Sequence, residues 1–144
     1  MREILFRGRD HAGMWHYGGF RHFVEDCFGR SLDKYYIVSE SDYIHDRYYY
    51  VVPETISQFV GRYDKNGAKI WENDIVKLRH SPNRIYQVVW DAESAMFKLK
   101  CLKYSISCNN ESYETNFYNV DSRDVEIVGN IFDNPEILKG GENQ

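Results

Sequence analysis

Turn signals at short intervals are the feature of this sequence that most limits what it can fold into. Polar pieces containing Gly, Pro, Asn or Asp, such as residues 64–67 and 80–83, recur along the chain. The segments between them are short, alternate apolar and polar residues and are rich in aromatic side chains, which make up 16% of the 144 residues. Short alternating segments bounded by turns predict β-strands. Several of them at close spacing predict a small barrel or a strongly curved sheet, so the expected fold class is mostly β with minor α.

The expected strands cover most of the chain. They are residues 3–7, 14–20, 34–39, 47–52, 58–63, 69–71, 75–79, 84–90, 95–103, 116–120 and 124–132. Asn66-Gly67 predicts a hairpin turn, because this pair readily takes positive φ angles. One short helix is expected within residues 21–33, with Gly29 as its end. Apolar residues recur there at helical spacing: Phe20, Phe23, Val24, Cys27 and Phe28.

Charge and composition narrow the class of protein. The net charge of -4 argues against a highly basic nucleic-acid coat, and no apolar run is long enough to span a membrane. The first nine residues alternate charged and apolar residues and show no signal-peptide core. The three cysteines, Cys27, Cys101 and Cys108, are an odd set without metal or redox spacing. We therefore expect a cytoplasmic protein in which Cys101 is a buried apolar residue.

Positive charge concentrates in the middle of this acidic chain, at residues 62–103. Strand alternation places Lys77 and Arg79 on one face of their strand, and Lys98 and Lys100 on one face of theirs. If both strands belong to one sheet, the four cations form a basic patch that could hold a nucleic-acid backbone while exposed rings stack on bases. The alternative is the ordinary polar face of a half-buried strand, where edge lysines prevent aggregation.

The run Tyr48, Tyr49, Tyr50 predicts a protein-binding surface. Alternation sends neighbouring rings to opposite faces of a strand, so some ring must be exposed. Aromatic residues are enriched in the cores of protein interfaces. The run therefore favours binding of a protein partner or of a second copy, and the alternative is that the rings cover the chain's own core.

No catalytic, cofactor or metal motif is found. The five histidines lie in different expected elements without zinc spacing, although His16 and His22 could face each other. Glycine-rich phosphate loops are also missing. Two carboxylate pairs could hold a cation but lack a calcium-loop pattern: Asp42 with Asp46, and Asp121 with Asp124. We expect a protein that is not an enzyme and uses no cofactor or metal.

Three motifs follow one another along the chain: residues 2–8 with 15–18, residues 52–61 with 64–76, and residues 125–138. Together they resemble the YopX family, small proteins encoded by phages, prophages and other mobile elements. The resemblance implies a mostly β fold with an SH3-like small barrel in the C-terminal half, and it defines no activity and no catalytic residue.

Several residues of these motifs are expected to have structural roles. Gly61 is expected to permit a close backbone approach, and Thr55 and Asp74 to bond nearby backbone groups. Asn73 stands where the family usually has glycine, and asparagine tolerates a left-handed turn nearly as well.

The expected organisation is a single YopX-like domain over residues 1–144. It comprises an N-terminal mixed subregion at 1–56, a small-barrel subregion at 57–138 and a frayed tail at 139–144. The expected function is that of a phage or mobile-element accessory protein that is not an enzyme and acts by binding a protein partner or by self-association. Nucleic-acid binding through the basic face is the first alternative, and an enzyme of unknown type is the second.

Overall fold

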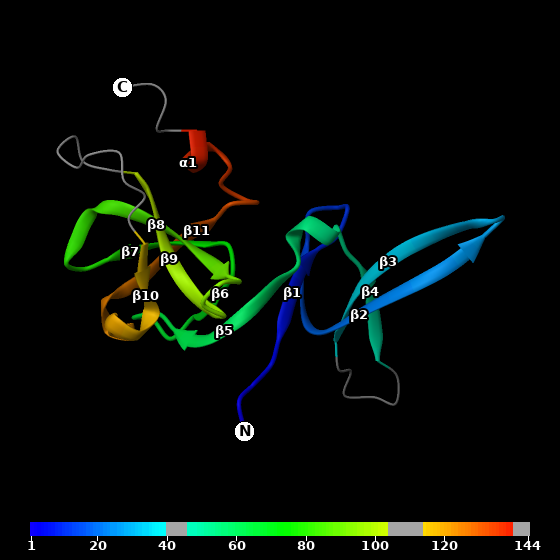
Figure 1. Ribbon diagram of the computed structural model, residues 1–144, viewed down its shortest axis with the longest axis horizontal. Helices are drawn as coiled ribbons and strands as arrows, with labels where there is room; N and C mark the ends of the chain where they lie inside the picture. The colour runs from blue at the N-terminus through cyan, green and yellow to red at the C-terminus, as the bar shows by residue number, and fades with distance from the viewer. Residues whose placement is uncertain (40–45, 104–113, 140–144) are drawn as a thin grey trace. The chain divides into compact units, whose positions relative to one another are not determined.

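The computed structural model describes residues 1–39, 46–103 and 114–139, and these ranges are mostly β-strand (Figure 1). The chain divides into two compact units, Met1–Phe59 and Val60–Gln144. Strand β5, at Ser57–Tyr63, begins in the first unit and ends in the second. Cys108 and nearly all of the predicted tail lie outside the described residues. No helix in the described ranges is long or apolar enough to cross a membrane.

The first unit is an antiparallel sheet. Its strands are β1 (Phe6–Arg9), β2 (Trp15–Cys27), β3 (Arg30–Ser39) and β4 (Arg47–Tyr50), in the order β4-β3-β2-β1, and β1 also pairs with the start of β5. Ile37 and Val51 are fully buried, and a side chain at Gly8 would meet both of them. The 3-10 helix η1 (Pro53–Thr55) follows. Thr55 Oγ1 accepts from the Arg9 amide at 2.8 Å and donates to the Val52 carbonyl at 2.6 Å, so the predicted local bonding of Thr55 is confirmed.

The helix predicted within residues 21–33 is wrong, because this segment forms the outer part of a long β-hairpin. Strands β2 and β3 pair antiparallel from Gly19 opposite Val38 to Cys27 opposite Arg30. The two residues of the turn, Phe28 and Gly29, have φ angles of 52° and 76°. Two successive positive φ angles match the right-handed twist of paired strands, which is why the chain reverses there in two residues.

The second unit contains a five-stranded antiparallel sheet in the order β10-β9-β8-β7-β11. Its strands are β7 (Asp74–Leu78), β8 (Ser81–Asp91), β9 (Met96–Lys103), β10 (Glu114–Asn116) and β11 (Val125–Asn130). Strand β6 (Lys69–Trp71) pairs with the end of β5. Two 3-10 turns, η2 (Phe117–Asn119) and η3 (Ser122–Asp124), and the short helix α1 (Glu136–Lys139) complete the unit. The strand predicted at 116–120 is therefore mostly a 3-10 turn, and the SH3-like barrel stays a prediction.

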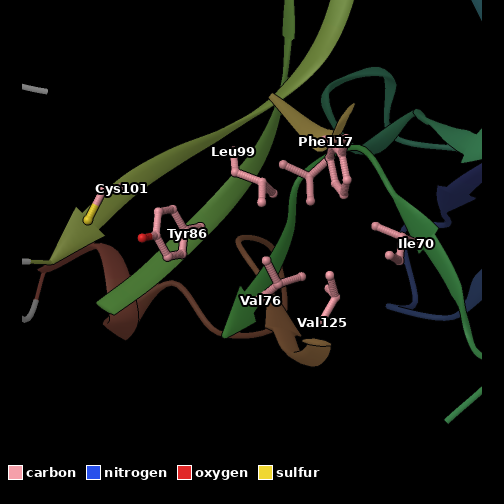
Figure 2. Close-up of a cluster of buried hydrophobic side chains, with 8 residues drawn as sticks. Ile70, Val76, Tyr86, Leu99, Cys101, Phe117 and Val125 are labelled. Carbon is pink, nitrogen blue, oxygen red and sulfur yellow. The ribbon is translucent and has the colours of Figure 1, made fainter. Parts of the chain in front are cut away.

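The core of the second unit lies on one face of this sheet (Figure 2). Register places Val76 opposite Tyr86, and Tyr86 opposite Cys101, so side chains from three neighbouring strands meet on that face. Cys101 is buried, as predicted. The full cluster is Ile70, Val76, Tyr86, Val88, Leu99, Cys101, Phe117 and Val125.

The Asn66-Gly67 turn is stabilised by a carboxylate as well as by glycine. Only Gly67 takes a positive φ, 80°, so the expectation of positive φ angles is met at one residue of the pair. Asp64 is buried, and its Oδ1 accepts hydrogen bonds from the backbone amides of Asn66 and Ala68, each at 2.9 Å. The turn therefore depends on two residues of the motif, Asp64 and Gly67.

The other motif residues also act locally. Asn73 has a φ of 69°, so the left-handed turn predicted there is confirmed. The buried Asp74 accepts from the Trp71 amide at 2.8 Å, as predicted. The close approach predicted at Gly61 is wrong, because a Cβ there would meet nothing within 4 Å. Its φ of 87° is what favours glycine.

Candidate functional site

The tyrosine run lies on β4, at the edge of the first unit's sheet. Tyr48 pairs with Val38 and Tyr50 pairs with Tyr36, so Tyr48 and Tyr50 share one face of the sheet. The Tyr36 ring centroid lies 6.1 Å from that of Tyr48 and 5.6 Å from that of Tyr50. Tyr49 points to the opposite face and stacks on His16 at 3.8 Å. The run therefore divides between the two faces.

Phe23 on β2 extends this group of rings. Its centroid lies 5.7 Å from Tyr36 and 6.4 Å from Tyr48. Phe23, Tyr48 and Tyr50 keep 44%, 52% and 46% of their surface exposed. Phe23, Tyr36 and Tyr48 line a shallow hollow of about 320 Å³ together with Glu25. We call Phe23, Tyr36, Tyr48 and Tyr50 the aromatic face.

Beyond the aromatic face, β2 and β3 have only each other as neighbours in the described sheet. We call residues 20–27 and 30–35 the ribbon, which Figure 1 shows tapering to a tip. Large apolar side chains are exposed there: Val24 at 60%, Leu32 at 47% and, in the turn, the whole ring of Phe28. An isolated two-stranded ribbon is only marginally stable in water. The ribbon thus presents apolar surface without a core of its own.

The charged residues of the ribbon are balanced in number. The ribbon has three cations and three carboxylates, and one ion pair joins two of them. Lys34 Nζ lies 2.6 Å from Glu25, whose hydrogen bond raises the pKa of that ammonium. His22 Nε2 lies 2.8 Å from Asp33 and the His22 ring stacks on Tyr35 at 4.5 Å. The ribbon therefore carries no net charge with His22 neutral.

The histidines do not form a reactive pair. His16 and His22 were expected to be able to face each other, but each bonds its own carboxylate. His16 Nε2 lies 2.8 Å from Asp10, and this hydrogen bond lowers the pKa of Asp10. Within residues 1–39, 46–103 and 114–139, no group of three or more His, Cys, Asp or Glu side chains could hold a metal ion.

The described carboxylates that were considered as a cation site, Asp121 and Asp124, each have another side chain as partner. Asp121 is bound by the Arg123 guanidinium at 2.7 Å, which lowers its pKa to about 2. Asp124 lies 3.4 Å from His80 Nε2. The partner predicted for Asp46, Asp42, is outside the described residues.

The predicted basic residues lie in two places. Lys98 and Lys100 are on β9, whereas Lys77 is on β7 and Arg79 follows its end, with β8 between the two strands. Within the described ranges, Lys98 is the one of these three lysines with a carboxylate at ion-pair distance. Lys98 Nζ lies 2.5 Å from Asp91. The registers place Lys100 opposite Glu114 and Lys77 opposite Glu126.

Sequence reasoning missed two members of the aromatic face and two cations near Lys77. Phe23 and Tyr36 reach Tyr48 only through the pairing of β2, β3 and β4, and Phe23 had been assigned to a helix. Lys65 and Arg123 line one cleft with Lys77 and Arg79, although they come from separate turns. The sequence signal for the hairpin is Gly29 in the middle of the segment, where it forms a two-residue turn with Phe28.

Comparisons with known proteins agree on the fold. A family model described as YopX protein matches residues 21–139. The crystal structure of protein EF1440 from Enterococcus faecalis is similar, with a TM-score of 0.51 and 17% sequence identity over 96% of this chain and 99% of that chain. At this identity the likeness shows the fold alone. No curated protein matches the chain.

Proposed function

Since the chain belongs to the YopX family, we propose that it is a non-catalytic accessory protein of a phage or other mobile element. It acts by binding protein through the aromatic face and the adjoining ribbon. The mobile-element origin rests on the family resemblance. The observation that supports the binding role is the exposed group of rings contributed by β2, β3 and β4.

The aromatic face gains from being covered. About half of each of the Phe23, Tyr48 and Tyr50 side chains is exposed, and burying that part of one ring contributes about 1 kcal/mol. The rings already contact one another, so little conformational freedom is lost when a partner covers them. Leu32 adds further exposed apolar area on the same face of the ribbon.

The occupant we propose is a second copy of the chain. The ribbon as a whole has equal numbers of cations and carboxylates, with an excess of cations on the Phe23 face and the carboxylates Asp26 and Asp33 on the opposite face, so a second copy brings both signs of charge. Rings that pack edge to face within one copy offer the same geometry to rings of another.

Nucleic-acid binding along β9 is less well supported. The Lys98 ammonium is engaged by Asp91, and Lys100 lies opposite Glu114. Asp91 and Glu114, which both lie within 4.0 Å of the Lys98 ammonium, repel the phosphates that a nucleic-acid backbone would bring. For an enzymatic role, the described ranges offer no group of three or more His, Cys, Asp or Glu side chains that could hold a metal ion.

Sedimentation equilibrium over a range of protein concentrations tests the proposal. We expect the mass to rise from 17.1 kDa toward twice that value as concentration increases. The variant F23S/Y48S should stay monomeric, because it removes two of the four rings of the aromatic face.

Tyr63→Ser is the matched control, because Tyr63 is an exposed tyrosine of the second unit outside the aromatic face. It should associate like the unaltered chain. A mass of 17.1 kDa at every concentration, or equal association by the F23S/Y48S variant, would overturn the proposal.

A further inference from the structure

A cleft in the second unit carries a feature unrelated to the aromatic face. It lies at β7 and β11 and has a volume of about 510 Å³, which is the size of a small-molecule site. Four cations and two carboxylates line it: Lys65, Lys77, Arg79, Arg123, Asp124 and Glu126. Leu78 and Pro82 add an apolar wall.

Two of the four cations are already neutralised. Lys65 Nζ donates to Glu126 at 3.0 Å. The Arg123 guanidinium binds both carboxylate oxygens of Asp121, with Nη2 at 2.7 Å from Oδ2. These two side chains therefore have less to offer to a ligand.

Lys77 and Arg79 differ from the other two cations of the cleft in having no ion-pair partner among the described residues. Within the described ranges, neither side chain has a carboxylate at ion-pair distance, and both are exposed. Glu126, opposite Lys77 in the register, is the carboxylate that binds Lys65, and Asp124 lies 3.4 Å from His80. The cleft therefore has two cations available for an anion.

Backbone hydrogen bonds fix the positions of the two cations in the lining of the cleft. Lys77 is fixed on β7 by pairing with β11. The Arg79 amide donates to the Asp124 carbonyl at 2.9 Å, which anchors the chain directly after β7. Because both positions are fixed by main-chain bonds, a ligand needs to order only the two side chains.

We propose that this cleft binds a phosphate monoester, with Lys77 and Arg79 as the residues that hold the phosphate. A monoester carries about 1.5 to 2 negative charges at neutral pH, enough to engage Lys77 and Arg79 together, whereas Asp124 is the lining carboxylate that it must avoid. A guanidinium also binds two phosphate oxygens at once. A phosphodiester within a nucleic-acid chain has one charge per phosphate and matches less well. The monoester belongs either to a free small molecule or to the 5′ end of a nucleic acid.

NMR titration of the ¹⁵N-labelled full chain distinguishes these sources. The probes are inorganic phosphate, adenosine monophosphate, and one oligonucleotide with and without a 5′-phosphate, at constant ionic strength set with chloride. We expect the amide signals of residues 77–79 and 124–126 to shift with every probe that has a terminal phosphate. The oligonucleotide without one should leave them in place.

Substitutions locate the site. Lys77→Met and Arg79→Met should each weaken phosphate binding about tenfold, the effect of losing one charged hydrogen bond. Lys100→Met is the control, because Lys100 is an exposed cation of the same sheet outside the cleft, and its affinity should not change. Thermal unfolding of each variant verifies that the fold is kept.

Three results would overturn the proposal. They are the absence of shifts at millimolar phosphate, equal shifts with chloride alone, and an equal loss of affinity in the Lys100→Met variant. Stronger binding of the oligonucleotide without a terminal phosphate would instead assign the cleft to a nucleic-acid backbone and would also overturn the monoester. None of these results bears on self-association through the aromatic face.

Discussion

At the scale of single residues, ion pairs decide which predicted cation is available to a ligand. Lys98 and Lys100 alternate on β9 in the same way and look equivalent in the sequence. The Lys98 ammonium lies 2.5 Å from Asp91 and 4.0 Å from Glu114, and only 19% of the Lys98 side chain is exposed. Asp91 is seven residues away on β8, so the pair exists only because β8 and β9 form a hairpin. Alternation alone could not separate the two lysines.

The ion pair between Lys98 and Asp91 predicts how Asp91 titrates in acid. In the folded protein the pKa of Asp91 should be about 2, first because Lys98 donates a hydrogen bond to the carboxylate and second because Ser94 does so. A pKa lowered by folding stabilises the folded state above the unfolded value of about 4, and this contribution is lost as pH falls through about 2. NMR titration of the side-chain carboxyl measures it.

Lys98→Met should raise the pKa of Asp91 toward its ordinary value. Asp121 serves as the internal control, because its pKa is also lowered to about 2 but by Arg123. It should titrate identically in both proteins. An Asp91 that titrates at its ordinary pKa in the unaltered chain would contradict the expectation.

At the scale of elements, most strands were predictable and the outer hairpin was not. Strand β6 was predicted to the residue, since turn chemistry bounds it on both sides. The helical spacing of Phe20, Phe23 and Val24 misled the interpretation of residues 21–33. In the hairpin, Phe20 and Val24 lie on one face and Phe23 lies on the other, because side chains alternate along a strand. Both faces of the ribbon therefore carry apolar residues. A strand that is apolar on both faces loses its period of two and can imitate a helix.

The hairpin turn makes a second prediction. Gly29→Ala should destabilise the ribbon by about 1 kcal/mol, because alanine is strained at a φ of 76°. Amide hydrogen exchange should then become faster in residues 20–27, and exchange at Tyr86 and Val88 in the second unit should not change.

Gly19→Ala in the same hairpin is the control. Gly19 has no positive φ, and a Cβ there would meet only the Val38 carbonyl at 4.0 Å. Equal effects of the two substitutions on ribbon exchange would show that the turn conformation is not the cause.

At the scale of the whole molecule, burial is distributed unevenly. The second unit has a cluster of eight buried residues, whereas the ribbon of the first unit is exposed on both faces. The sequence predicted the mostly β class and the exposure within the tyrosine run, because both follow from local alternation. It could not predict that Phe23 and Tyr36 join Tyr48, because that depends on which strands become neighbours.

Substitution of two leucines tests this difference in burial between the core of the second unit and the ribbon. Leu99→Ala should lower the free energy of unfolding by about 2–5 kcal/mol, because Leu99 is fully buried and the substitution leaves a cavity. Leu32→Ala on the ribbon, where 47% of the side chain is exposed, should change it by less than about 1 kcal/mol. Urea unfolding of both variants compares them, and equal losses would contradict the assignment of the core.

The two faces of the ribbon also bear on how many copies can join. The face opposite Phe23 carries Asp26 and Asp33, which keep it hydrated. If the aromatic face of one copy met that acidic face of the next, each junction would leave both kinds of face free, and a fibre would grow. Contact between two aromatic faces uses the same surface twice and is then complete. The Phe23 face carries three cations against Glu25, so charge attraction to the acidic face favours the polymer, whereas ring packing between two aromatic faces favours the closed pair.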